Sequence, residues 1–294
     1  MPELPDIALY VDRLRSHLLG RKVTCVRLSS PFLLRTYDPP LGEVEGRALE
    51  GVRHIGKRIA LEFEGPLVLV LHLMIAGRLR LGPPGAVRFG ELMCLEFGDE
   101  ALFLTEVSKK KRASLHVLRS PKEASALDRG GMDPLAGSLE ELRSLLTLEN
   151  RTLKRFLTDP RRIAGIGNAY SDEILFWAEL SPMARTQSLS DSEIERLFVA
   201  IRHTLRAWIR FLDETTGEQF PEKVTAFRPE MAVHGRYKEP CLVCGTKIAR
   251  IVYAENEANY CPRCQTGGRL LADRALSRLL RKDWPKTIDE AEGG

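Results

Sequence analysis

The spacing of hydrophobic residues changes along the chain and indicates where helices and strands lie. Apolar residues recur with helical spacing from Pro5 to Leu18, and Gly20 ends this pattern. From residue 22 to residue 118 the chain instead has short, alternating runs rich in β-branched residues, separated by turn signals. We expect strands at Val23–Leu28, Ile59–Phe63, Leu67–Leu73, Arg78–Leu81, Glu91–Phe97, Ala101–Thr105 and Ser114–Leu118. This pattern predicts a mainly antiparallel β-sandwich or barrel.

Residues 119–138 form a predicted linker, because Pro, Gly, Ser and Asp are concentrated there and no strand period survives. Helical spacing follows, and we expect helices at Leu139–Leu148, Arg151–Asp159, Asn168–Leu180 and Ser192–Leu212. Ser190 and Glu193 have the spacing of a capping box for the last of these helices. A short basic helix is also expected at Ala272–Leu280.

Length and composition exclude several classes of protein. A chain of 294 residues favours two domains, or one domain with an added module. Its 44% hydrophobic and 29% charged residues exclude a disordered chain, a collagen and a small disulfide scaffold. Apolar runs such as Pro66–Leu73 are too short to cross a bilayer, and no leader-like segment precedes them. We therefore expect a cytoplasmic protein that does not bind membranes.

The net charge of +4 is small but unevenly distributed. Residues 241–283 carry eight basic and four acidic side chains, so this one segment matches the charge of the whole chain. A local basic face suits a polyanion such as nucleic acid. A solvated basic surface explains the same excess.

Four of the six cysteines form two closely spaced pairs, Cys241 with Cys244 and Cys261 with Cys264. Four thiolates in this arrangement can surround one Zn²⁺ ion as a tetrahedron, and residues 248–260 have the pattern of two strands between the pairs. Disulfides are the alternative, but they are rare in a reducing compartment. We therefore predict one structural zinc ion, and we interpret Cys25 and Cys94 as small core residues.

The N-terminus offers a candidate nucleophile. Removal of the initiator methionine, which is general before a small residue, would leave Pro2 with a free secondary amine. Such an amine can form an iminium with a sugar C1′ once an N-glycosidic bond opens. Glu3 is adjacent and can act as the acid or base that moves protons. A proline near an N-terminus is, however, more often a residue of the first helical turn.

Three separated motifs together resemble the formamidopyrimidine-DNA glycosylase and endonuclease VIII family. They are Met1–Asp6 at the start, Ala164–Tyr170 in the helical half and the four-cysteine finger near the end. The resemblance runs from residue 1 to about residue 269. It implies an α+β protein with an N-terminal helix and a β-sandwich, followed by a helical domain with a helix-two-turn-helix element and a zinc finger. The implied domains are a catalytic β-sandwich at 1–118, a linker at 119–138, a DNA-binding helical domain at 139–235, a zinc finger at 236–270 and a C-terminal tail at 271–294.

The resemblance also implies roles for particular residues. Pro2 matches the family's N-terminal nucleophile, Glu3 its catalytic carboxylate and Lys57 its phosphate-contacting lysine. Asn168 matches the residue that binds the phosphate flanking the lesion, and Lys154 stands where relatives place another basic contact. Glycines before a helix independently favour an anion there, although a tight helix connection is the better explanation if the motif is taken alone.

A base must leave the duplex before its C1′ can be attacked, and wedge side chains fill the gap. The family's wedge loop corresponds to Leu73–Gly77, where Ile75 aligns with the usual methionine and Met74 lies beside it. Core packing is the alternative explanation for these apolar residues.

Two segments depart from the family pattern. Asn256 stands where the family carries a phosphate-clamping arginine, and Asn brings no charge. The segment Glu106–Ala113 contains four consecutive cations, including Lys110 and Arg112, where relatives place an arginine and a phenylalanine that probe the opposite base. These cations suit phosphate contacts, and a solvated loop is the alternative. This departure puts opposite-base reading of the 8-oxoguanine type in doubt. Filling the gap from Leu73–Ile75 alone would resemble endonuclease VIII, which prefers oxidised pyrimidines.

The sequence thus predicts a bifunctional DNA glycosylase and abasic-site lyase, acting on oxidised or otherwise damaged bases through an N-terminal proline Schiff base. The expected partner is damaged DNA, the expected state is a monomer, and the location is cytoplasmic, with nucleoid association if the source is bacterial. The alternative is a lesion- or structure-recognition protein of the same fold that has lost base excision.

Overall fold

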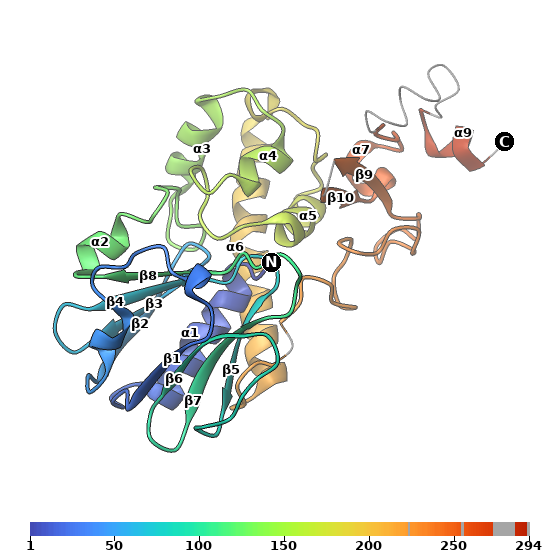
Figure 1. Cartoon of the computed structure of the whole chain (residues 1–294). Coiled ribbons are helices and arrows are strands. Elements are labelled where there is room, and N and C mark those ends of the chain that lie inside the picture. Colours follow the sequence, from blue (N-terminus) through green and yellow to red (C-terminus); the bar gives the residue numbers. More distant parts are fainter. Residues whose placement is uncertain (223, 254–255, 273–285, 293–294) are drawn as a thin grey trace. The chain divides into compact units, whose positions relative to one another are not determined.

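The computed structural model describes residues 1–222, 224–253, 256–272 and 286–292, and it has the predicted α+β fold (Figure 1). The chain forms two compact units, and neither is continuous in sequence. The first consists of Met1–Arg129 with Trp208–Ala226, and the second of Gly130–Ala207 with Phe227–Gly294. The continuous domain ranges predicted from sequence stay a prediction, whereas this grouping by contacts places residues 119–129 and 208–226 with the first unit.

The first unit begins with α1 (Leu4–Leu18) and contains two four-stranded antiparallel sheets. One sheet has the order β1-β6-β7-β5 and the other the order β2-β3-β4-β8. The strands of the first sheet are β1 (Cys25–Leu28), β6 (Glu91–Glu96), β7 (Ala101–Glu106) and β5 (Gly77–Gly82). Those of the second are β2 (Leu49–Ile55), β3 (Arg58–Phe63), β4 (Val68–His72) and β8 (Ser114–Leu118).

The core of this unit explains the strand pattern. One cluster of buried side chains joins α1 to both sheets, with members such as Ile7, Leu71 and Leu95. Val68 and Val70 point to the opposite side of β4 and belong to a second cluster that also includes Ala124 of the short helix α2 (Pro121–Ser125). Strand β4 is therefore apolar on both faces, which explains why its sequence is a continuous apolar run.

The structure confirms each predicted strand within a few residues, and its additional elements include β2 and α2. Strand β2 was not predicted, because a register shift between Leu49 and Gly51 breaks its alternation. Helix α2 lies inside the predicted linker, where the Ser120 hydroxyl accepts a hydrogen bond from the backbone N–H of Glu123 at 3.2 Å. A proline and a serine can thus begin a helix as well as mark a loop.

The second unit is mainly helical, with α3 (Leu139–Thr147), α4 (Leu153–Thr158) and α5 (Asn168–Trp177). Helix α6 (Asp191–Thr216) begins in this unit and ends in the first. The predicted capping box at its start is confirmed, because the Ser190 N–H donates to the Glu193 carboxylate at 2.8 Å and the Glu193 N–H donates to the Ser190 hydroxyl at 3.3 Å.

The cysteine-rich part contains the expected antiparallel hairpin of β9 (Ala249–Tyr253) and β10 (Asn256–Tyr260). Helices α7 (Pro262–Thr266) and α9 (Ile288–Glu292) follow. The helix predicted at Ala272–Leu280 lies outside the described residues beyond Ala272. Among the helices that the structure describes, none combines the length and apolarity needed to cross a membrane.

Candidate functional site

The start of α1 positions the predicted catalytic carboxylate. Glu3 is the N-cap residue, and its backbone N–H donates to the Asp6 carboxylate at 3.0 Å in a capping-box arrangement. Glu3 is 2% exposed and Asp6 is 1% exposed, and Pro2 is buried beside them. A helix N-terminus favours negative charge, which suits an acidic residue at this position.

The N-terminal amine lies in the same electrostatic neighbourhood as Glu3 and Lys57. Burial lowers the pKa of the Met1 amine; the charge of Glu3 acts against this effect, and the charges of Arg78 and Lys57 add to it. Lys57 lies in the tight turn between β2 and β3. This amine belongs to Met1, and the nitrogen of the predicted nucleophile Pro2 is in a peptide bond while Met1 is present. The structure thus places the predicted residues Glu3 and Lys57 within electrostatic reach of the start of the chain, where Pro2 is buried.

The loop between β4 and β5 presents Ile75 to solvent. The Ile75 side chain is 54% exposed, whereas Leu73 is buried and Met74 is partly buried. Met74 has a positive φ of 52°, and its N–H donates to Nδ1 of His72 at 3.2 Å. The Gly77 N–H donates to the Leu73 carbonyl at 2.9 Å, and a Cβ at Gly77 would lie 2.4 Å from that oxygen. Ile75 is therefore not a core residue, but an exposed apolar side chain on a constrained loop.

The cationic segment after β7 is organised by one buried carboxylate. Glu106 is 1% exposed, and its side chain accepts hydrogen bonds from the N–H groups of Arg112 at 2.8 Å and Ala113 at 3.0 Å. The ammonium of Lys111 donates to the Glu106 carbonyl. The side chains of Lys110 and Arg112 are exposed. Their position is compatible with both explanations given above, phosphate contact and a solvated loop.

In the second unit, the turn before α5 sets the position of Asn168. Gly165 has a φ of +78°, and Gly167 is the N-cap of the helix. The turn is fixed to a neighbouring segment, since the Ala164 N–H donates to the Met132 carbonyl at 2.9 Å and the Met132 N–H to the Arg162 carbonyl at 3.0 Å. Asn168 follows as the first helical residue and is partly exposed. Its place at a helix N-terminus suits an anion.

Lys154 is only 6% exposed, and its ammonium binds inside the second unit. It donates to the Asn168 carbonyl and to the Asp172 carboxylate, both at 2.6 Å. Asp172 is 1% exposed, and its other oxygen lies 2.8 Å from Nδ1 of His234 and 3.4 Å from Nδ2 of Asn259. We call Lys154, Asp172, His234 and Asn259 the Asp172 network. Lys154 therefore holds the residue predicted to bind phosphate.

The sequence reasoning missed this network. Helix α5 is buried along most of its length, yet it contains the consecutive acids Asp172 and Glu173. A charged residue in an otherwise apolar helix indicates a buried partner, and this was the available signal. Glu173 accepts hydrogen bonds from three backbone N–H groups at 2.8 to 3.0 Å, those of Ala232, Val233 and His234. The segment before the finger is thereby attached to α5.

The four finger cysteines converge as the sequence predicts. Their sulfur atoms all lie within 4.8 Å of one another, with Sγ–Sγ distances of 3.9 Å for Cys241 and Cys264 and 3.4 Å for Cys244 and Cys261. A zinc tetrahedron with Zn–S bonds of about 2.3 Å requires S–S separations of about 3.8 Å, so the site fits the ion. None of these cysteines forms a disulfide. The finger is a structural zinc site.

For Asn256, the structure describes the backbone but not the side chain. It begins β10 and pairs with Tyr253. On the same hairpin, the Arg250 guanidinium lies 4.2 Å from the ring centroid of Tyr237 and 3.3 Å from the Glu257 carboxylate. Arg250 is thus already engaged, and the role of Asn256 stays a prediction.

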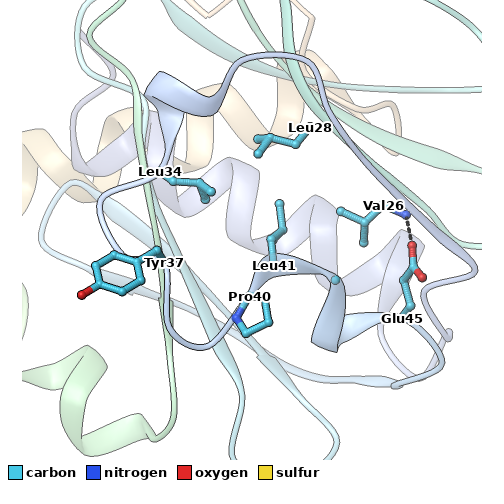
Figure 2. A pocket seen from close by; sticks show the side chains of 8 residues that line it. Val26, Leu28, Leu34, Tyr37, Pro40, Leu41 and Glu45 are labelled. Carbon is cyan, nitrogen blue, oxygen red and sulfur yellow. Dashed lines mark hydrogen bonds between the residues drawn. The ribbon is translucent and has the colours of Figure 1, made fainter.

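An apolar hollow of about 350 Å³ lies elsewhere in the first unit, beside the edge strand β1 (Figure 2). Val26, Leu28 and Leu41 contribute apolar side chains to it, and the Val26 N–H donates to the Glu45 carboxylate at 2.8 Å. None of the predicted site residues lines it. The hollow is therefore separate from the candidate site.

A β-sandwich that begins with a capped helix, together with a helical unit and a four-cysteine finger, defines the class of zinc-finger DNA glycosylases. Family models match three parts of the chain: the formamidopyrimidine-DNA glycosylase N-terminal domain at residues 1–118, its H2TH domain at 131–219, and the zinc finger found in FPG and IleRS at 238–267. The chain belongs to the formamidopyrimidine-DNA glycosylase family.

Individual relatives match over nearly their whole length. The formamidopyrimidine-DNA glycosylase of Geobacter sulfurreducens is 31% identical, with 90% of this chain and 100% of the relative covered. The formamidopyrimidine-DNA glycosylase of Thermus thermophilus is 32% identical, with 91% of this chain and 100% of the relative covered. Among solved structures, Lactococcus lactis Fpg in complex with DNA containing an abasic site has a TM-score of 0.80 at 23% identity, and covers 90% of this chain and 99% of its own. This structural likeness supports the fold.

Proposed function

We propose that this protein is a base-excision DNA glycosylase with abasic-site lyase activity on oxidised or otherwise damaged bases. The observation that carries the proposal is the arrangement at the start of the chain. Pro2 and Glu3 are buried at the start of α1, and the amine of Met1, the residue before Pro2, interacts electrostatically with both Glu3 and Lys57. Family membership supports the glycosylase class, and the arrangement supports the covalent chemistry.

The proposed reaction begins when Met1 has been removed. The nitrogen of Pro2 attacks C1′ of the damaged nucleotide, the glycosidic bond breaks, and the base leaves and takes up a proton. Glu3 donates a proton to the sugar ring oxygen as the ring opens, and the nitrogen and C1′ form an iminium. Loss of a proton from C2′ then breaks the C3′–O bond, and water releases the sugar product and restores the amine. Lys57 binds phosphate and assists proton transfer.

DNA binding is proposed to use residues of both units. In the first unit, Ile75 and Met74 fill the space left by the displaced base, and Lys110 and Arg112 contact phosphates. In the second unit, Asn168 binds the phosphate next to the lesion, Lys154 fixes the Asn168 backbone at 2.6 Å, and Asn256 replaces the family arginine with an uncharged group. The zinc ion, held by the four cysteines, stabilises the finger that presents this hairpin.

Borohydride trapping tests the covalent step. Full-length protein, whose intact mass shows that Met1 has been removed, is incubated with abasic-site and oxidised-base duplexes in the presence of borohydride. We expect a covalent adduct that Pro2→Gly greatly reduces and that Lys122→Gln, an exposed control on α2, leaves unchanged. Absence of any adduct on every substrate, while a family enzyme traps in parallel, would rule out the proposed nucleophile.

The same experiment separates the alternative function. A lesion-recognition protein that has lost base excision would bind damaged duplexes tightly, yet form no adduct and release no base. Its binding would also be unaffected by Pro2→Gly. Release of a free base from an oxidised-base duplex excludes this alternative.

A further inference from the structure

A polar pocket of about 560 Å³ opens where α4 ends and the turn toward α5 begins. Its lining includes the side chains of Asn150, Arg151, Arg155, Thr158, Asp159 and Arg185. We call it the arginine pocket. It contains none of the residues that the sequence predicts to bind DNA.

The two acidic residues of this pocket, Glu149 and Asp159, already have partners. Arg151 binds Asp159 at 2.8 Å and also binds Glu149. A second guanidinium reaches each carboxylate, because Arg161 lies 3.0 Å from Asp159 and Arg162 lies 3.2 Å from Glu149. Hydrogen bonds from Arg161 lower the pKa of Asp159 to about 2. Both acids therefore stay charged and fully engaged at neutral pH, and they hold Arg151 in a fixed position.

Two further arginines line the pocket without a carboxylate partner among the described residues. Arg155 and Arg185 are both exposed. The Arg185 guanidinium donates to the Asn150 carbonyl at 3.3 Å, and Arg155 forms no ion pair with any residue that the structure describes. The pocket therefore carries positive charge beyond what its own acids neutralise.

This arrangement selects the chemistry of the ligand. Guanidinium groups match the oxygens of a phosphate with two parallel hydrogen bonds, and a concave site limits competition from water. The pocket also lies close in sequence to the predicted phosphate site, since Arg155 directly follows Lys154, which contacts the Asn168 backbone. We propose that the arginine pocket binds a DNA backbone phosphate in addition to the one assigned to Asn168. This inference rests on the DNA binding of the proposed function, but not on base excision.

The salt dependence of DNA binding tests the pocket. The logarithm of the affinity falls linearly with the logarithm of the salt concentration, with a slope of about 0.9 per neutralised phosphate. The full-length double variant Arg155→Gln/Arg185→Gln is compared with wild type on a long duplex. We expect the slope to fall by about 1 in the variant, because one phosphate contact is lost. Arg155→Lys, which keeps the charge, should retain most of the slope.

Arg206→Gln is the matched control, because Arg206 is also exposed and donates to one backbone carbonyl, that of Leu135, at 3.4 Å. Equal slopes for wild type and the double variant on the long duplex would overturn the proposal. This holds even if titration shows that inorganic phosphate binds wild type and not the variant, since the pocket would then serve free phosphate instead of DNA. Base excision is scored separately by borohydride trapping, so an inactive protein with a reduced slope still supports the pocket.

Discussion

The buried ion pair between Lys154 and Asp172 makes a quantitative prediction about the stability of α5. Lys154→Met keeps most of the side-chain volume but removes the ammonium that Asp172 and the Asn168 carbonyl both bind at 2.6 Å. Asp172 then keeps its contacts with His234 and Asn259, at 2.8 and 3.4 Å. It remains a buried charge whose cationic partner has been lost.

The size of the effect follows from burial. Lys154 is 6% exposed and Asp172 is 1% exposed, so the weak interaction typical of surface pairs does not apply. Removing one partner of a buried ion pair destabilises the folded state by about 3–5 kcal/mol. Because Asp172 keeps its other partners, we expect a value of about 3 kcal/mol. Since about 1.4 kcal/mol is a factor of ten, local opening of α5 should become about a hundredfold more frequent.

Amide hydrogen exchange measures this opening directly. Peptides that cover residues 168–177 should exchange about a hundredfold faster in Lys154→Met, while peptides from α1 in the other unit serve as the internal reference. Adding Asp172→Asn removes the stranded charge, so the double variant should be less destabilised than the sum of the two single variants by about 1–3 kcal/mol. If α5 of Lys154→Met exchanges at the wild-type rate, the ion pair does not stabilise the helix. The same conclusion follows if the destabilisations of the two single variants simply add up in the double variant.

Three further predictions concern other sites. Glu106→Gln should weaken the two backbone hydrogen bonds at Arg112 and Ala113 and make the 107–113 loop more sensitive to protease, with Glu64→Gln as an exposed control; equal cleavage rates would contradict this. Burial lowers the pKa of His72 from 6.5 to about 4, so the unfolded state takes up the proton first and stability should fall by up to about 3 kcal/mol as the pH drops from about 6.5 to 4. His72→Gln should flatten this part of a pH series of urea unfolding curves, and a curve parallel to wild type would refute the assignment. Chelation should remove one zinc ion per chain, measured by a colorimetric assay, and α5 exchange should accelerate as Asn259 leaves Asp172; unchanged exchange would separate the finger from the Asp172 network.

Patterns of local spacing were enough to predict most of the fold. Alternation predicts the strands, and the cysteine spacing predicts the zinc site, because both depend on a short stretch of chain. Strand β2 was missed where a bulge near Gly51 interrupts the alternation, and no spacing rule anticipates an interruption of this kind.

The candidate site was predictable only in part, because long-range pairing decides which way a polar side chain points. Lys154 is a basic residue of the kind that contacts DNA, but its ammonium binds Asp172, eighteen residues further along the chain. Similarly, Ile75 is an apolar residue of the kind that packs in a core, yet the turn that ends at Gly77 exposes it to solvent. Burial and partner choice therefore have to be read from the folded chain.

The first unit is completed by a segment that is synthesised late. Val224 lies in its hydrophobic core, the ring of Phe220 lies 5.7 Å from that of Tyr10, and Arg13 donates to the Gly217 carbonyl at 2.8 Å. These contacts join residues about two hundred positions apart, a separation that slows folding. On the ribosome, α1 and the two sheets emerge long before these partners do. Helix α1, which begins at the residues with the proposed covalent chemistry and is among the first parts to be made, therefore completes its packing only when most of the chain has left the exit tunnel.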